Sequence, residues 1–400
     1  YGGQSLMFGP DYLIPRPFDP RLILTIAPAV ARAAMDSGVA TRPIDDFEAY
    51  EERLNQFVFR SGLVMKPVFE RAKADPKRIA FAEGEEERVL HAVQVMVDEG
   101  LAKPILIGRR SVVKNRIKKL GLRFRLDRDV GLCDPEDDPR YSDYWQLYHG
   151  IMGRKGVSPD FARTVVRTDT TVIAALMVRR GEADGFLCGT VGRYQDHLHN
   201  VLDVVGKAKG VRDFSALSLI ILPKGTYFIC DTYVTPDPTA DELAEMAILA
   251  SSEIERFGIT PKVALVSHSN FGGRDSPTAQ KVREAVQILS ERAPHLEADG
   301  EMHADAALNE EIRNRIFPGS RLKGQANLLV MPNLDAANIA LTMLKTIGDA
   351  LSVGPILLGT DLPAHILTPS VTVRGIVNMG AMTVVDAQSR HASPDFKDDR

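Results

Sequence analysis

The chain is poor in cysteine and has no long apolar run. Its 400 residues include three cysteines, Cys133, Cys188 and Cys230, with no Cys-x-x-Cys pair among them. This pattern favours neither a disulfide framework nor a zinc site, and we expect a reducing compartment, the cytoplasm. No run of about 18 apolar residues occurs, so no membrane-spanning helix is expected. The N-terminus also lacks the charged-then-apolar order of a signal peptide.

A strong charge of one sign is missing as well. The formal net charge is −4, which gives no general attraction for nucleic acid. Arg109 and Arg110 form a basic cluster with the lysines of 114–119, but no aromatic residues are interleaved, so we interpret it as the solvated face of a helix. Neither nucleic acid nor a membrane is expected as a partner. With 44% hydrophobic and 26% charged residues, the composition fits a globular protein of two or three domains.

Several catalytic motifs are absent too. The sequence contains no Walker A motif, no His-Glu-x-x-His motif and no dinucleotide-binding glycine fingerprint. Asp196, His197 and His199 lie in one predicted helix, where residues two apart point in different directions, so no metal site is expected. Ser267 precedes His268 without the Gly-x-Ser-x-Gly elbow of a nucleophile, which favours a ligand-contacting hydroxyl over a catalytic one.

From residue 78 onward, short apolar runs alternate with helical segments. The predicted strands are 79–82, 104–107, 185–188, 217–222, 227–230, 263–266, 328–331 and 355–358. The predicted helices are 86–98, 142–152, 158–166, 168–180, 239–257, 277–292 and 373–386. Such alternation is typical of an α/β protein with a parallel sheet and covering helices. The turn at 223–225 predicts a hairpin between two of the strands.

Polar segments follow several of these strands. The glycine-rich turn at 189–192 follows the strand at 185–188, and the loop at 267–273 follows the strand at 263–266. Backbone amides of a glycine-rich turn can bind phosphate, although a simple tight turn explains the same glycines equally well. Parallel sheets usually bind ligands at strand ends, so the residues alone indicate a site for a phosphorylated ligand.

The segment 324–345 organises the rest of the chain. Its apolar run 328–331 ends at Pro332, and Asn333 is the predicted N-cap of the next helix. The predicted apolar stripe of that helix comprises Leu334, Ala337, Leu341 and Leu344. Asp335 and Asn338 lie in the first turn, beside the strand end. They either contact a ligand or serve the helix dipole and a loop, and this segment alone favours the second explanation.

Three longer segments, 235–243, 299–308 and 326–339, resemble the phosphate acetyltransferase family, and the likeness extends over about 58–388. The resemblance implies the two-lobed α/β fold of that family, an isocitrate-dehydrogenase-like α/β/α sandwich with the cleft between lobes. It places lobe I at about 57–219 plus 355–388 and lobe II at about 220–354. Residues 389–400 are expected to form a disordered tail.

Residues 8–21 and 27–41 resemble the C-terminal end of bacterial malic enzymes. The whole chain is therefore similar to the C-terminal part of hybrid NADP-dependent malic enzymes, in which a malic-enzyme module precedes a phosphotransacetylase-like one. We expect 1–44 to be the tail of the malic-enzyme module, cut from a longer chain, and 45–56 to be a linker helix. The resemblance implies that NADP and a divalent metal bind only in the missing module.

The likeness to the acetyltransferases breaks at the positions that family uses for catalysis. Acetyl transfer between CoA and phosphate needs cations for the phosphoanion. Here those positions hold Thr368, Pro369, Gly375, His199 and Met152. Proline in place of a phosphate-binding arginine removes a permanent charge, which costs roughly 3 to 4 kcal/mol of transition-state stabilisation by analogy with oxyanion-type donors. We therefore expect no catalytic residues and no acetyltransferase turnover.

The positions that match the family form the walls of the cleft. We expect a CoA thioester, acetyl-CoA or CoA, to bind there as an effector of the malic-enzyme module. The predicted ligand-binding residues are Gly189, Thr190, Ser267, Ser269, Asn270, Asp305, Asn327, Asn333, Asp335 and Asn338. The resemblance also implies a homodimer within a larger homo-oligomer. Two alternatives stay open: an active phosphate acetyltransferase whose cation is Arg193 or Arg274, and a purely structural oligomerisation module.

Overall fold

The computed structural model describes residues 20–348 and 350–391. The chain divides into two compact units between Val64 and Met65. The first unit contains α1 (Pro20–Asp36) and the beginning of α2 (Phe47–Ala74), and the second contains the end of α2 and all later elements. The predicted linker helix 45–56 is thus the first part of a longer helix. Among the described residues, none of the helices combines the length and apolarity needed to cross a bilayer.

The first unit is held by a small contact between its two helices. Arg32 on α1 donates to the Glu51 carboxylate at 3.2 Å, and its guanidinium lies 4.8 Å from the centroid of the Phe47 ring. Asp46 begins α2 by accepting the Ala49 N–H at 2.9 Å. Because the Arg32 and Glu51 side chains are largely exposed, their ion pair contributes at most about 1 kcal/mol. The predicted malic-enzyme tail before Pro20 lies outside the described residues.

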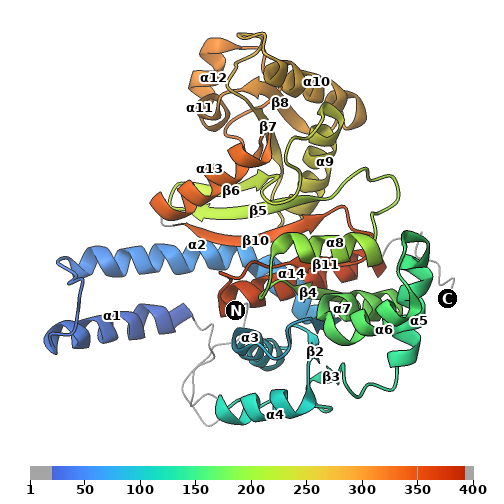
Figure 1. The fold of residues 1–400 in the computed structure, drawn as a ribbon. Coiled ribbons are helices and arrows are strands. Elements are labelled where there is room, and N and C mark those ends of the chain that lie inside the picture. The colour runs from blue at the N-terminus through green and yellow to red at the C-terminus, as the bar shows by residue number, and fades with distance from the viewer. Residues whose placement is uncertain (1–19, 349, 392–400) are drawn as a thin grey trace. The chain divides into compact units, whose positions relative to one another are not determined.

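The second unit contains two sheets (Figure 1). The first sheet has the strand order β11-β4-β1-β2-β3, and all its pairings are parallel. Its strands are β1 (Arg78–Phe81), β2 (Lys103–Ile107), β3 (Gly131–Cys133), β4 (Gly185–Cys188) and β11 (Ala364–Ile366). Parallel strands need crossover connections, which explains the alternation of apolar runs and helices in the sequence.

Helices cover both faces of the first sheet. α3 (Glu87–Asp98) and α14 (Val373–His391) pack together, and α14 also packs against β1 and β4. α7 (Thr170–Arg179) packs against β1, β2 and β4. Phe186 joins the buried cluster around α7, whereas the next residue in β4, Leu187, points to the opposite face. The remaining helices of this lobe are α4 (Arg110–Lys119), α5 (Tyr141–Met152), α6 (Pro159–Thr168) and α8 (Tyr194–Val204), with a 3-10 turn η1 (Gly153–Lys155).

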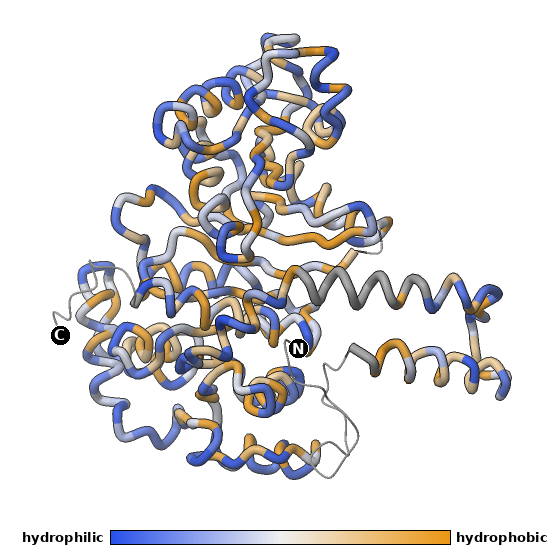
Figure 2. The backbone as a smooth tube through the Cα atoms, turned by 180° about the vertical axis from the view of Figure 1, so that it is seen from behind, coloured by the Kyte–Doolittle hydropathy of each residue, from blue (hydrophilic) through white to orange (hydrophobic). Residues whose placement is uncertain are grey.

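The second sheet has the order β10-β5-β6-β9-β7-β8 and mixes both orientations. β10 (Leu351–Leu358), β5 (Ser215–Leu222) and β6 (Gly225–Cys230) are antiparallel neighbours, which confirms the predicted hairpin. β9 (Leu328–Val330), β7 (Lys262–Val266) and β8 (Glu297–Met302) run parallel to β6. The helices are α9 (Ala240–Arg256), α10 (Pro277–Arg292), α11 (Ala304–Leu308), α12 (Glu310–Ile316) and α13 (Leu334–Ile347). Figure 2 shows hydrophobic residues along the central strands, as expected for buried sheets.

The two halves of the chain build the first lobe together, because β11 and α14 return to it after the second sheet is complete. This arrangement confirms the predicted two-lobed α/β fold. The predicted lobe limits at 219/220 and 354/355 fall inside β5 and β10, which pair with each other, so strand pairing moves each limit to a neighbouring loop. The predicted disordered tail begins inside α14, which continues to His391, and its residues 392–400 lie outside the described range.

Several local expectations failed, and β3, β8 and β11 were not predicted as strands. No strand was predicted at β8, because its sequence Glu-Ala-Asp-Gly-Glu-Met is acidic and contains glycine, both unfavourable in strands. In α13, the predicted apolar stripe is only partly buried: Ala337 and Leu341 are buried, but Leu344 is 36% exposed. The last turns of α13 therefore present apolar side chains at the surface.

Candidate functional site

Glu83 occupies the point of the first sheet where the strand order reverses. The chain leaves β1 toward β2 on one side and later places β4 on the other, and open α/β sheets bind ligands at such a switch point. The Glu83 carboxylate accepts the Gly189 N–H at 2.9 Å and the Thr190 hydroxyl at 3.1 Å. Burial raises the pKa of Glu83, against the hydrogen bonds from Gly189 and Thr190. The glycine turn, for which the sequence left phosphate binding and a simple tight turn equally open, thus donates hydrogen bonds to a carboxylate of its own chain.

The conformation of this turn requires glycine. Gly189 has φ = 93°, and a Cβ at this position would collide with the carbonyl oxygen of Leu367. The backbone of β4 therefore comes unusually close to the end of β11. The positive φ and the close approach explain the glycine by the turn itself, and phosphate binding by this turn stays a prediction.

Arg88, in the first turn of α3, forms hydrogen bonds that connect the loops after β1, β4 and β11. Its guanidinium donates to the carbonyl oxygens of Pro369 at 2.7 Å, Val371 at 2.9 Å and Thr190 at 3.2 Å. Its Nε also donates to Glu86 at 2.7 Å. These bonds direct the charge of Arg88 to protein groups, so it is not a free cation for a phosphate.

A pocket of about 460 Å³ extends along the carboxyl ends of β1, β2 and β3. Arg109 forms a forked pair with Glu85, with two N···O distances of 2.9 Å, and holds the pKa of Glu85 below its usual range. Arg116 donates to the Glu85 carbonyl oxygen. Arg167 also lines the pocket, and its guanidinium lies 4.1 Å from the centroid of the Tyr141 ring. The remaining lining residues are Ala82, Glu83, Glu86, Ile107, Gly108, Pro135, Glu136, Thr170 and Val191.

In the second lobe, two buried carboxylates shape the strand-end loops. Asp231, after β6, accepts backbone N–H groups from Ala216 at 2.9 Å and Thr235 at 2.7 Å, and burial raises its pKa against these bonds. Glu301, in β8, accepts the Ser269 hydroxyl at 2.8 Å and Arg283 at 3.1 Å. Burial alone would raise the pKa of Glu301, but the hydrogen bond from Arg283 and those from its other donors hold it below its usual value. Both carboxylates organise loops and were not predicted as site residues.

The structure brings some of the predicted second-lobe residues to these loops and gives most of them local partners. Ser267 is 7% exposed, and its hydroxyl has no hydrogen-bond partner among the described residues. Ser269 binds Glu301, and Asn270 accepts the His303 N–H at 2.7 Å. Asp305 is exposed and accepts the N–H of the following residue. A partnerless buried hydroxyl at a strand end fits the predicted ligand contact best.

The predicted asparagines separate into two groups. Asn333 caps α13 by accepting the Ala336 N–H at 2.9 Å, as predicted, and Asn338 donates to the Thr232 carbonyl at 3.2 Å, with Asp335 exposed between them. Asn327 instead precedes β9, an interior strand of the second sheet, and lies at the amino-terminal end of that strand. Its amide accepts the Lys262 N–H at 2.7 Å and donates to Thr260 at 2.8 Å, so it is separated from the other predicted residues.

The two lobes meet at a pair of tyrosines. The rings of Tyr194, from α8, and Tyr233, after β6, have centroids 5.0 Å apart, and Gln195 donates to the Tyr233 carbonyl at 3.2 Å. The Tyr194 hydroxyl is buried without a hydrogen-bond partner among the described residues. Sequence patterns carried no signal for this contact, because it joins segments of different lobes.

The positions predicted to replace the family's catalytic residues carry neither arginine nor lysine. Thr368 shares a hydrogen bond of 3.1 Å with Ser370, and Pro369 presents its carbonyl to Arg88. Met152 is buried, and His199 bonds the Gln195 carbonyl of its own helix at 2.7 Å. Gly375 lies in the first turn of α14. Among residues 20–348 and 350–391, no group of three or more metal-ligating side chains occurs.

Comparison with known proteins agrees with this architecture. A model of the phosphate acetyl/butaryl transferase family matches residues 63–384, and the chain belongs to that family. A phosphotransacetylase structure from Streptococcus pyogenes superposes with a TM-score of 0.77 at 29% identity, covering 82% of this chain and 98% of that one.

Two malic enzymes are more similar in sequence. The chain is 60% identical over 388 residues to an NAD-dependent malic enzyme of Rhizobium meliloti, covering 97% of this chain and 50% of that protein. It is 53% identical over 390 residues to an NADP-dependent malic enzyme of Salmonella typhimurium, covering 97% and 51%. The chain thus spans about half the length of these relatives, and the similarity includes the segment before residue 63. The predicted resemblance to malic enzymes with a phosphotransacetylase-like part is confirmed.

Proposed function

We propose that this chain is a regulatory module that binds a CoA thioester and controls an attached malic enzyme. Its family membership supports acetyl-CoA or CoA as the ligand. Its similarity to malic enzymes supports a parent polypeptide that oxidatively decarboxylates malate to pyruvate, with NADP and a divalent metal bound outside this chain. The phosphotransacetylase chemistry of the module itself is lost.

The loop after β11 carries this proposal. An acetyltransferase must hold a phosphoanion next to the reacting thioester, and a cation at that place provides much of the stabilisation. Here Pro369 supplies a carbonyl oxygen instead. The N–H groups of the nearby Arg88 donate to the carbonyl oxygens of Pro369, Val371 and Thr190. A phosphoanion at this loop would therefore meet carbonyl oxygens and an Arg88 that already donates to protein groups, whereas the uncharged thioester group of acetyl-CoA needs no such cation.

We assign ligand binding to the groups that the folded chain leaves available for contacts with a ligand. The buried Ser267 hydroxyl offers one hydrogen bond, and the pocket beside Val191 offers volume and the Arg167 charge. Gly189 and Thr190 contribute the shape of their turn, because their polar groups bind Glu83. Asn327 lies at the amino-terminal end of β9, where its side chain bonds the Lys262 N–H and the Thr260 carbonyl oxygen.

The full-length polypeptide that contains this chain provides the test. Malate oxidation is measured with NADP and with NAD at subsaturating malate, across a range of acetyl-CoA concentrations. A concentration-dependent change in rate supports regulation, and no change contradicts it. Formation of acetyl-CoA from acetyl phosphate and CoA by the same sample would instead establish an active acetyltransferase, with Arg193 or Arg274 as the first cations to replace.

We also propose that the module forms a homodimer within a larger homo-oligomer, as its family resemblance implies. Sedimentation velocity of the chain alone and of the full-length polypeptide tests this directly. A monomer at every concentration would contradict the proposal. Stable association without any binding of a CoA thioester would favour the purely structural role.

A further inference from the structure

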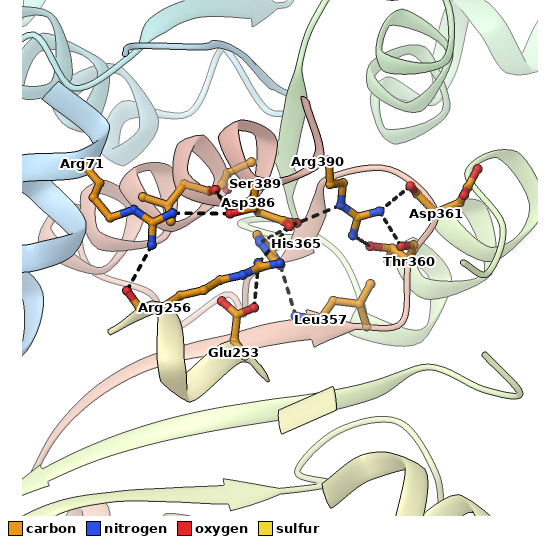
Figure 3. A network of polar contacts seen from close by, with 12 residues as sticks. Arg71, Glu253, Arg256, Leu357, Thr360, Asp361, His365, Asp386, Ser389 and Arg390 are labelled. Atoms are coloured by element: carbon orange, nitrogen blue, oxygen red, sulfur yellow. Dashed lines mark hydrogen bonds and ion pairs between the residues drawn. The ribbon is translucent and has the colours of Figure 1, made fainter. Parts of the chain in front are cut away.

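A cluster of buried charges lies where the second lobe meets the first (Figure 3). Glu253 and Arg256 come from the end of α9, and Asp386 and Arg390 come from α14. Arg256 Nη1 lies 2.8 Å from Glu253 Oε2 and 2.9 Å from Asp386 Oδ1, and Arg390 Nε lies 3.2 Å from the same Asp386 oxygen. The Asp386 and Glu253 side chains are only 4% and 6% exposed, so water does not replace these contacts.

The cluster also fixes the crossover between the two sheets. His365, in β11, accepts the N–H of Leu357, in β10, at 3.2 Å. Arg390 donates to the carbonyl oxygens of Thr360, at 2.7 Å, and Asp361, both in the connection between these strands. β11 then leads, within two residues of its end, to Thr368 in the strand-end loop of the candidate site. The charges therefore hold the connection through which the lobes are joined.

The last turns of α2 dock onto the same place. Gln388 on α14 donates to the carbonyl oxygens of Arg71 and Asp75, both at 2.8 Å. Arg71 donates to the Arg256 carbonyl at 3.5 Å and to the Ser389 hydroxyl at 3.4 Å. The end of α2 thus touches the ends of α9 and α14, one from each lobe.

This geometry has a mechanical consequence. A ligand that contacts loops of both lobes favours one relative position of the lobes. Because a buried ion pair cannot be stretched without leaving a charge unpaired, α9 and α14 either move together or exchange partners in a discrete step. Either response changes the surface on which Gln388 and Arg71 hold α2.

We propose that a cluster of buried charges transmits a change in the relative position of the two lobes to α2. The cluster consists of Glu253, Arg256, Asp386 and Arg390. Gln388 and Arg71 make the contacts through which this change reaches α2. This proposal rests on the proposed regulatory function and assigns the residues that transmit it. The end of α2 from Met65 onward belongs to the same compact unit as the cluster, so the response to lobe position is measured there. Gln388 and Arg71 are positioning residues and touch no ligand.

The test uses the full-length polypeptide with Gln388→Leu and Arg71→Gln, and with Arg71→Lys as the conservative variant. Lys66→Gln is the matched control, because Lys66 lies on the same helix and its ammonium lies 3.8 Å from the carboxylate of the exposed Glu70. Three quantities are measured: acetyl-CoA affinity by calorimetry, the malate oxidation rate with and without acetyl-CoA, and amide hydrogen exchange of 65–74 in both states.

We expect Gln388→Leu and Arg71→Gln to bind acetyl-CoA within about twofold of the parent and to keep its basal rate. The effect of acetyl-CoA on the rate should fall about tenfold, in line with typical coupling energies, and its effect on exchange in α2 should disappear. Lys66→Gln should behave as the parent, and Arg71→Lys should retain part of the response.

The outcomes separate the two proposals. If acetyl-CoA regulates the parent and both variants equally, the relay is wrong and the regulatory function stands. If acetyl-CoA neither binds nor changes the parent's rate, the regulatory function fails and the relay fails with it. If the variants lose acetyl-CoA affinity in proportion to the lost response, Gln388 and Arg71 support the binding site and the relay is also overturned.

Discussion

Arg256 on α9 and Asp386 on α14 form a buried ion pair between the two lobes, with Nη1 2.9 Å from Oδ1. The helix of Arg256 packs against the mixed sheet and the helix of Asp386 packs against both sheets, so the pair adds a charged contact between the two lobes. Burial, Arg390 and Arg256 all affect the pKa of the Asp386 carboxyl. The arginines outweigh burial and hold the pKa of Asp386 at about 2.

Removal of Arg256 should destabilise the fold strongly. Arg256→Ala leaves Glu253 buried without its cation and weakens the pairing of Asp386, a loss typically worth about 3 to 5 kcal/mol. The control is Arg212→Ala, whose ion pair with Asp241 at 3.1 Å is exposed and should cost about 0.5 kcal/mol or less. Urea unfolding followed by circular dichroism measures both. Equal losses of unfolding free energy in the two variants would show that the buried cluster stabilises the fold no more than an exposed ion pair does.

The stability should depend on the protonation of His365. Burial lowers the pKa of His365 from 6.5 to about 4, so the folded chain holds this imidazole neutral while the unfolded chain protonates it. The stability from this group is fully present above pH 6.5 and is lost as the pH falls through 4. The total is about 3 kcal/mol, since each pKa unit corresponds to about 1.4 kcal/mol. The free energy of unfolding of the parent should therefore fall between pH 6.5 and 4 relative to His365→Asn.

Glu253 provides the opposite control for this measurement. Burial raises the pKa of Glu253 from 4.5 to about 7, against the attraction of Arg256. Its stabilising contribution is present below pH 4.5 and is lost as the pH rises through 7. The parent should lose stability relative to Glu253→Gln as the pH rises across that window. Unfolding curves of parent and variants that run parallel from pH 4 to 7 would contradict both assignments.

Substitution of Gly189 should disrupt the turn after β4. Gly189→Ala places a methyl group against the Leu367 carbonyl oxygen at a positive φ, and we expect a loss of about 3 kcal/mol or more together with loss of acetyl-CoA binding. Gly100→Ala is the matched control, because Gly100 has φ = 64° and open space around its Cα, which limits the cost to about 1 kcal/mol. Similar melting temperatures for the two variants would refute the close approach of β4 to Leu367.

The hydroxyls of Ser267 and Ser269 should differ in what they do. Ser267→Ala removes a buried hydroxyl that has no partner among the described residues, so stability should stay within about 0.5 kcal/mol or rise, while acetyl-CoA affinity falls three- to tenfold, or about 1 kcal/mol. Ser269→Ala removes a bond to Glu301 and should cost about 1 to 3 kcal/mol in stability. Calorimetry and thermal unfolding separate the two effects. Unchanged affinity in Ser267→Ala would remove this residue from the proposed site.

The sequence predicts the parts of this fold that depend on local rules. The N-cap at Asn333 occurs as expected, because the Asn333 side chain and the Ala336 N–H are only three residues apart. The β5–β6 hairpin follows from its turn residues in the same way. β8 was not predicted because Asp299 and Glu301 are residue types expected at the surface. In the fold both are buried, and Ser320 and Arg283 are their partners.

The site depends on contacts that local patterns do not reveal. Glu83 reaches Gly189 across more than one hundred residues of chain, and this pairing decides that the glycine turn binds a carboxylate. Arg88 and Pro369 are still farther apart. The sequence did single out the loops that meet at the strand ends, since strand periodicity identifies them. Which of their polar groups remain available to a ligand follows only from the folded arrangement.

We propose that this chain binds acetyl-CoA but does not catalyse acetyl transfer. The decisive test is calorimetric titration of this chain with acetyl-CoA, followed by an acetyl-phosphate turnover assay on the same sample. An active phosphate acetyltransferase serves as the positive control for the assay. We expect saturable binding of acetyl-CoA and no acetyl-CoA formation above the buffer rate. Turnover would show that Pro369 and its neighbours have not abolished the family's reaction, and absence of binding would leave only a structural module.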